Sequence, residues 1–273
     1  MSRDKDPTGR SDQHNARGIE LADKGWLDEA VKEFLRAIEL DPEAAHAHDN
    51  LATVYAEQKK LREALHEHLV ALRLDPESAT VHFNLAAFLS ANATDLAIES
   101  YRTALAIDPL FPDAQLNLGL TLADEGQVEE ALAALRTAAD QAPEDPLPRH
   151  ELATLLLDEG EYRAAIGQLK EVVRLAPDLF DAWLDLGIAY AQQGFYEESA
   201  RAYAGAARLR PDDLLLNYNL GGLHALWGKP VEALAALRRA LAIDPVKVRG
   251  WLKDDRMYQP LEENTQFQEL ARG

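Results

Sequence analysis

The chain has 273 residues, of which 47 are acidic and 28 are basic, so its formal net charge is −19. This charge has the wrong sign for neutralising phosphates, which disfavours nucleic acid and anionic membrane surfaces as partners. Cysteine is absent, and this excludes disulfides, thiolate metal sites and cysteine nucleophiles.

The N-terminal segment, residues 1–10, carries charges where a secretion signal would need an apolar run, and we expect it to be flexible. The longest uncharged stretch, Ser78 to Thr94, falls short of the roughly 20 apolar residues that a membrane-spanning helix needs. We therefore expect no membrane insertion and a cytoplasmic location.

A repeat of about 34 residues follows this segment. Its marker is a regularly spaced proline, at Pro42, Pro76, Pro109, Pro143, Pro177, Pro211 and Pro245. Alignment on this proline predicts seven units, which cover residues 11–247: 11–44, 45–78, 79–111, 112–145, 146–179, 180–213 and 214–247. The proline is numbered here as position 32 of each unit, so that equivalent positions can be compared.

Small and large residues alternate inside each unit in a helical pattern. Position 8 is always glycine or alanine, and positions 20 and 27 are alanine in most units, whereas large residues occupy positions 7 and 24. Glycines such as Gly25 and Gly126 separate two stretches of about a dozen residues. Each unit is therefore predicted to be a helix, a tight turn and a second helix, with small residues at the helix contact. The proline ends the second helix.

This pattern resembles the tetratricopeptide repeat. The resemblance is fullest in the sixth unit, which has Trp183, Leu186, Gly187, Tyr190 and Pro211. It implies an all-α fold, a right-handed superhelical α-solenoid of helix-turn-helix repeats. Residues 248–273 are predicted to form a C-terminal capping helix and tail that covers the last repeat.

In this family the first helices line a concave groove, so the resemblance implies that their positions 2, 5, 6 and 9 face it. Position 6 carries asparagine in four units, at Asn50, Asn84, Asn117 and Asn219. A carboxamide has both a donor and an acceptor, so it can pair with the backbone of a bound peptide. The alternative is that asparagine is simply common at this position of the repeat.

Apolar residues occupy the neighbouring groove positions, at Phe83, Leu116, Leu120, Leu184, Ile188 and Tyr218. A row of exposed apolar side chains indicates partner contact, although these residues could instead pack between helices.

Acidic residues complete the predicted groove, at Glu151, Asp181 and Asp185, and Arg149 is the only base among them on these first helices. An acidic channel attracts basic segments. The alternative is that these charges only keep the protein soluble.

Histidines concentrate in the second and third units, and His68 falls at a core position. We expect them to pack as ordinary interior or surface residues rather than to bind metal. No nucleotide-binding, hydrolase or metalloprotease motif occurs. Because the repeats use nearly the whole length, we expect no catalytic residues, no cofactor and no enzymatic activity.

The sequence therefore predicts a non-catalytic protein-interaction scaffold whose groove binds an extended, partly basic peptide or a helix of a partner protein. The alternative is a self-associating platform that forms a homo-oligomer.

Overall fold

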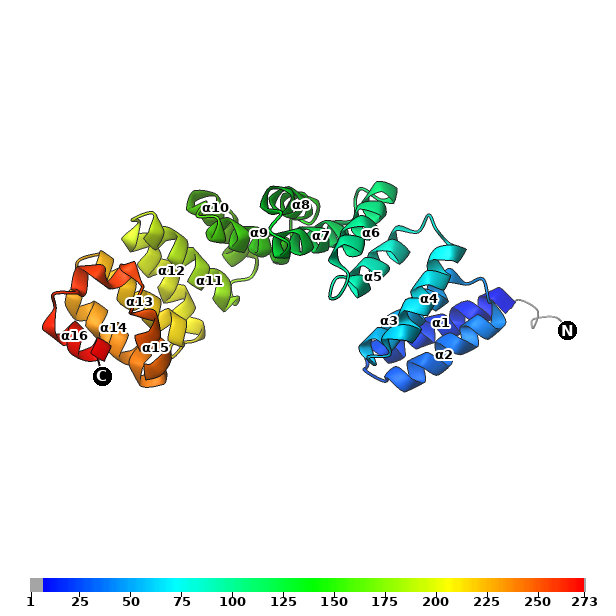
Figure 1. The fold of residues 1–273 in the computed structure, drawn as a ribbon, viewed down its shortest axis with the longest axis horizontal. Helices are drawn as coiled ribbons and strands as arrows, with labels where there is room; N and C mark the ends of the chain where they lie inside the picture. The colour runs from blue at the N-terminus through cyan, green and yellow to red at the C-terminus, as the bar shows by residue number, and fades with distance from the viewer. Residues whose placement is uncertain (1–6, 273) are drawn as a thin grey trace. The chain divides into compact units, whose positions relative to one another are not determined.

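The structure, a computed structural model, describes residues 7–272, and no strand occurs within them. The chain divides into two compact units, residues 1–141 and 142–273, each a succession of helix pairs (Figure 1). The prediction of an all-α fold of helix-turn-helix repeats is confirmed.

The first unit contains four helix pairs. In each pair the first helix packs on the second, and the eight helices are α1 (Pro7–Asp23), α2 (Leu27–Leu40), α3 (Ala45–Glu57), α4 (Leu61–Leu74), α5 (Ala79–Leu89), α6 (Thr94–Ile107), α7 (Pro112–Asp124) and α8 (Val128–Gln141). Of the N-terminal segment expected to be flexible, residues 1–6 lie outside the described residues. Residues 7–10 instead form the first turns of α1.

The second unit contains three helix pairs and three shorter helices. The pairs are α9 (Pro146–Asp158) with α10 (Tyr162–Leu175), α11 (Phe180–Gln192) with α12 (Tyr196–Leu209), and α13 (Leu214–Leu226) with α14 (Pro230–Ile243). The shorter helices are α15 (Pro245–Trp251), the 3₁₀ helix η1 (Arg256–Leu261) and α16 (Thr265–Arg272). Below, α1, α3, α5, α7, α9, α11 and α13 are called first helices, and their partners second helices.

Tight turns join the two helices of each pair, and most contain a residue with positive φ. Gly25 has a φ of +76° between α1 and α2, a conformation that glycine adopts without steric cost. Lys59 takes the equivalent position between α3 and α4, with a φ of +62°. The predicted turn is therefore present even where glycine is missing.

The contact between paired helices depends on small residues facing large ones. A Cβ atom added to Gly187 of α11 would lie 2.3 Å from the ring of Tyr203 of α12. The same relationship holds in the first unit, where a Cβ on Gly18 would lie 2.5 Å from the ring of Phe34. These pairs join positions 8 and 24, so they support the helical register inferred from the sequence.

Successive repeats are joined by a recurring hydrogen bond. The side chain at position 4 of a first helix reaches back to the carbonyl of the proline six residues earlier, which no longer has a helical partner. The distances are 3.4 Å for His48 and Pro42, 3.0 Å for His82 and Pro76, 2.9 Å for Trp183 and Pro177, and 3.1 Å for Asn217 and Pro211.

The C-terminal segment differs from the single capping helix that was predicted. Three short helices cover the last repeat, and they begin at Pro245, three residues before the expected boundary. New helices start after Asp244 and after Asp255, because each of these aspartates caps a helix N-terminus. Asp244 accepts a hydrogen bond from the backbone N–H of Lys247, and Asp255 accepts one from Met257. Tyr258, which is buried, donates a hydrogen bond to the carbonyl of Tyr218 at 2.6 Å and anchors the segment to α13.

Candidate functional site

Neighbouring first helices are connected by polar side-chain pairs. Position 5 of one repeat bonds to position 6 of the next, 35 residues later. The pairs are Asn15 with Asn50 at 3.0 Å, Asp49 with Asn84 at 2.6 Å, and, in the second unit, His150 with Asp185 at 3.1 Å. Positions 5 and 6 therefore lie where adjacent first helices meet.

Three of the asparagines predicted to bind a peptide backbone, Asn50, Asn84 and Asn117, do not have equivalent surroundings. Asn50 and Asn84 each donate a side-chain N–H to the preceding first helix. The side chain of Asn117 makes no hydrogen bond to any residue that the structure describes, and it is half-buried. These asparagines therefore offer a peptide backbone fewer free donors than the sequence analysis assumed.

A buried polar cluster fixes the position of Asn84. Asp49 accepts the bond from Asn84 through Oδ2, and its Oδ1 lies 2.9 Å from His68 Nδ1. Asp49 and His68 are both buried, and the His68 ring lies 5.4 Å from that of Phe88. The prediction that His68 is a satisfied interior histidine is confirmed, whereas the role of Asp49 was not predicted.

Three of the six apolar residues that were predicted to face the groove are buried in the structure. Leu116, Leu184 and Tyr218 are 7%, 5% and 4% exposed, because position 5 packs between adjacent helices. They offer a partner little surface. The other three predicted residues, Phe83, Leu120 and Ile188, are half-buried.

The three predicted acidic residues of the second unit all act electrostatically on one histidine that the sequence analysis missed. His150 of α9 donates to Asp185 of α11, and this bond is the largest cause of a raised pKa at His150. Burial opposes the shift, and the negative charges of Asp185, Glu151 and Asp181 add to it. The acidic cluster, defined here as Glu151, Asp181 and Asp185, therefore acts as one electrostatic group.

A shallow cavity adjoins this cluster at the start of α9. It has a volume of about 350 Å³ and is lined by His150, the half-exposed Leu147, and residues of the turn before α11, among them Ala176 and Leu179. Arg149, the one base on these first helices, donates instead to Gln168 of α10 at 3.0 Å. Asp178 also lines the cavity, which is thus bordered by acidic and apolar groups.

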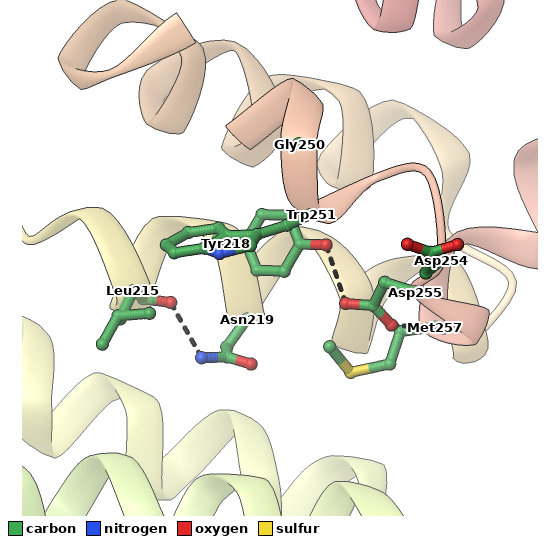
Figure 2. Close-up of a pocket in the computed structure, with 8 residues that line it drawn as sticks. All are labelled: Leu215, Tyr218, Asn219, Gly250, Trp251, Asp254, Asp255 and Met257. Carbon is green, nitrogen blue, oxygen red and sulfur yellow. Dashed lines mark hydrogen bonds between the residues drawn. The ribbon is translucent and has the colours of Figure 1, made fainter. Parts of the chain in front are cut away.

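A larger cavity lies at the last repeat, between α13 and the start of the C-terminal segment (Figure 2). Its volume is about 490 Å³, and its lining residues are Leu215, Tyr218, Asn219, Gly250, Trp251, Asp254, Asp255 and Met257. Leu215, Tyr218 and Asn219 occupy positions 2, 5 and 6, which were predicted to face the groove. The other five come from the segment to which the sequence analysis assigned only a capping role.

The wall of this cavity is held by a hydrogen bond from Tyr218 to Asp255. The phenol donates to Asp255 Oδ2 at 2.7 Å, and Met257 N donates to Oδ1 at 2.9 Å. Burial, followed by the bond to Asp255 and its charge, raises the pKa of Tyr218 above its ordinary value of 10.0, so the phenol stays protonated at neutral pH. The ring of Trp251 stands at 61° to that of Tyr218, with 4.9 Å between centroids.

Residues 7–272 contain neither a group of side chains that could hold a metal ion nor a helix that could span a membrane. No group of three or more histidine, aspartate or glutamate side chains there is arranged to hold a metal ion. None of its helices combines the length and apolar character required to cross a membrane.

Comparison with known proteins connects this arrangement to one family. A tetratricopeptide-repeat model matches residues 87–146, 150–213 and 184–247, and a second TPR-repeat model matches residues 18–59. The first of these models alone covers more than half of the chain.

Solved structures of TPR proteins superpose on large parts of the chain. YrrB, a TPR protein with an unusual peptide-binding site, is 26% identical with a TM-score of 0.58, over 67% of this chain and 95% of YrrB. PilF of Pseudomonas aeruginosa is 21% identical with a TM-score of 0.63, over 82% and 99% of the two chains. PilW, a type IV pilus biogenesis factor, is 24% identical with a TM-score of 0.65, over 76% and 96%.

The last two likenesses concern the fold alone. The repeat pattern, the helix pairs and the family models agree over the same residues, and the chain belongs to the tetratricopeptide-repeat family.

Proposed function

We propose that this protein is a non-catalytic interaction scaffold that binds an extended, partly basic segment of a partner protein along its first helices. The observation that carries the proposal is the acidic cluster of the second unit, in which Asp185 accepts a hydrogen bond from His150 and the charges of Glu151 and Asp181 add to the rise in the pKa of His150. A cluster of one sign on adjacent helices attracts a segment of opposite charge and orients it.

The apolar cavity beside the cluster adds a second contact. Leu147 is 48% exposed and lines this cavity with His150. An extended peptide places alternate side chains on one side, so one apolar side chain could occupy the cavity while a neighbouring basic one meets the cluster. YrrB, which has the highest sequence identity to this chain among the three solved structures described above, has a peptide-binding site, and this supports a peptide as the ligand.

The asparagines have a smaller part in this proposal than the sequence suggested. Asn50 and Asn84 each donate a side-chain hydrogen bond to the neighbouring first helix. Asn219 donates to the carbonyl of Leu215 within its own helix. Their remaining acceptor atoms can bind a peptide N–H, and Asn117 can offer both a donor and an acceptor. Charge selection therefore dominates over backbone contacts.

The experiment that tests the proposal compares two extended, fluorescein-labelled peptides by fluorescence anisotropy. One carries arginine at every third position, and the other carries neutral citrulline at the same positions. We expect the arginine peptide to bind more tightly, and rising salt to weaken it, because salt screens exposed charges beyond about 8 Å at physiological ionic strength.

A pair of variants localises the binding. Glu151→Gln combined with Asp181→Asn removes two charges of the acidic cluster and leaves the His150–Asp185 bond in place. Glu161→Gln combined with Glu197→Gln removes two exposed charges at second helices of the same unit. The proposal requires the first variant to bind the arginine peptide less well than the second. Equal affinity for both peptides, or an equal loss in both variants, would overturn it.

Self-association is the second candidate, and an exposed leucine stripe on α4 favours it. Leu61, Leu65 and Leu69 follow one another at one-turn spacing and are 51%, 38% and 51% exposed. Sedimentation velocity of the wild type and of a Leu65→Lys variant tests it. A concentration-dependent dimer that the variant abolishes would support self-association, and a monomer at all concentrations would exclude it.

A further inference from the structure

The larger cavity of the second unit combines features of a pocket for one particular kind of side chain. Its volume of about 490 Å³ lies within the range of roughly 300 to 1,000 Å³ typical of ligand sites. Figure 2 shows Tyr218, Trp251 and Met257 around it, with the carboxylates of Asp254 and Asp255 on one side. It is therefore a concave apolar site with a few convergent polar groups.

The charge of the cavity is negative. Two of its eight lining residues are aspartates, and none is lysine or arginine. Lys253 and Arg256 flank these aspartates in the sequence, but neither forms an ion pair with Asp254 or Asp255 among the described residues. The two carboxylates thus lack a close cationic partner within residues 7–272.

The acceptors of the cavity are held in place. Asp255 is fixed by Tyr218 and by the backbone of Met257, so ordering it costs a ligand little entropy. Asn219, which is 9% exposed, directs its Nδ2 to Leu215, and Figure 2 shows its Oδ1 on the opposite side. An amide oxygen and two carboxylates accept hydrogen bonds only, so they select a donor with positive charge.

The indole of Trp251 already lies beside one cation in this structure. The ammonium of Lys247, a residue outside the cavity lining, lies 5.3 Å from the centroid of that ring. Tryptophan is the aromatic side chain that binds cations best. An aliphatic stem entering the cavity would in addition contact Leu215 and Met257.

We propose that this cavity binds one cationic side chain, of arginine or lysine, from the partner segment. The proposal rests on the function proposed above and adds a defined pocket at its C-terminal end. The charged head meets Asp254 and Asp255, the stem packs on Leu215 and Met257, and Trp251 covers it. Asp254, whose exposed side chain makes no hydrogen bond or ion pair with the described residues, supplies the free charge.

Nuclear magnetic resonance of the full chain tests this pocket directly. The chain has four tryptophans, so a ¹⁵N-labelled sample gives four indole N–H signals, and Trp251→Phe identifies the one from the cavity. The probes are Nα-acetyl-arginine methylamide and Nα-acetyl-lysine methylamide, with the neutral Nα-acetyl-citrulline methylamide as the control. We expect both cationic probes to shift the Trp251 signal saturably, and citrulline to leave it in place.

The other tryptophans serve as internal controls. Trp26 and Trp227 also lie beside lysine side chains, Lys24 and Lys229, but they do not line this cavity. Equal shifts of all indole signals would show unspecific cation binding and would overturn the proposal. So would a Trp251 signal that no cationic probe moves.

A matched pair of variants assigns the charge. Asp254→Asn should weaken binding of the arginine probe about tenfold, the effect expected for loss of one charged hydrogen bond. Glu263→Gln removes the same charge from an exposed residue of the same C-terminal segment outside the cavity lining, and its affinity should equal that of the wild type. Equal affinities of the two variants would overturn the proposal.

The two proposals can fail separately. If the Trp251 signal shifts with the probes but the arginine peptide does not bind, the proposed pocket is supported and the proposed peptide-binding function is overturned. If peptide binding depends on Glu151 and Asp181 but no probe shifts the Trp251 signal, the proposed function is supported and the proposed pocket is overturned.

Discussion

His150 donates its Nε2 hydrogen bond to Asp185 across 3.1 Å, and this contact joins two first helices that are 35 residues apart in the sequence. The side chains are 16% and 22% exposed, so solvent only partly screens the interaction. The bond fixes the spacing of α9 and α11 in the part of the chain that carries the acidic cluster.

The first prediction concerns the pH dependence of stability. The pKa of His150 is raised above its ordinary value of 6.5, first by the bond to Asp185. A raised folded-state pKa means that the stabilisation is fully present below about pH 6.5 and is lost as the pH rises through the folded-state pKa. Asp185→Asn should therefore lower the free energy of unfolding more at acidic than at alkaline pH, as measured by urea unfolding across the pH range.

The control for this experiment is Asp212→Asn, which removes an exposed charge from the turn before α13. Its effect on unfolding should not follow the titration of a histidine. If the difference between wild type and Asp185→Asn stays constant with pH, the His150–Asp185 contact does not contribute as described.

The second prediction concerns the contact between paired helices. Gly187→Ala would place a Cβ atom 2.3 Å from the ring of Tyr203, and overpacking of this kind costs about 1 to 3 kcal/mol. Gly167→Ala, in the middle of α10, where the added Cβ would point into open space, should stabilise the protein by up to about 1 kcal/mol. Thermal unfolding followed by circular dichroism measures both. Equal effects would show that the helical register is wrong.

The third prediction separates two asparagines that look alike in the sequence. Asn84→Ala leaves Asp49 Oδ2, which is buried, without its donor, and we expect a loss of about 1 to 3 kcal/mol. Asn117→Ala removes a side chain that makes no hydrogen bond to the described residues, so its effect should stay within about 0.5 kcal/mol. Chemical unfolding of the two variants checks this. A similar loss in both would mean that the hydrogen bond from Asn84 to Asp49 makes no specific contribution to stability.

The fold could be predicted from the sequence because its determinants repeat. Pro177 and Pro211 mark the ends of second helices, and Gly187 faces Tyr203 as the spacing of small and large residues required. Each of these contacts lies within one repeat or between a repeat and the next, so a single period of the sequence contains the information.

The site could be predicted only in part, because its contacts do not repeat. Glu151, Asp181 and Asp185 were predicted from charge on first helices, but His150 was missed because its role depends on how adjacent helices meet. A search for polar residues at position 5 of one repeat and position 6 of the next would have found it. Leu116 and Leu184 were placed in the groove by position alone, and packing buries them.

The C-terminal cavity gave no sequence signal of this kind. Trp251, Asp254 and Asp255 lie beyond the last repeat, where no period predicts which side chains face α13. Their arrangement depends on the interruptions of the helix at Asp255 and Asn264, which divide the segment into three short helices.

The measurement that tests the central claim most directly is the association rate of the arginine-bearing peptide by stopped-flow fluorescence, at increasing salt. Exposed charges act mainly on association and are screened by salt. Asp181, which is exposed, should therefore control the rate. Asp181→Asn is predicted to slow association and flatten its salt dependence, whereas Glu197→Gln on α12 should match the wild type. Identical rates and salt dependence for wild type and Asp181→Asn would contradict the claim that the acidic cluster of the first helices selects a basic partner.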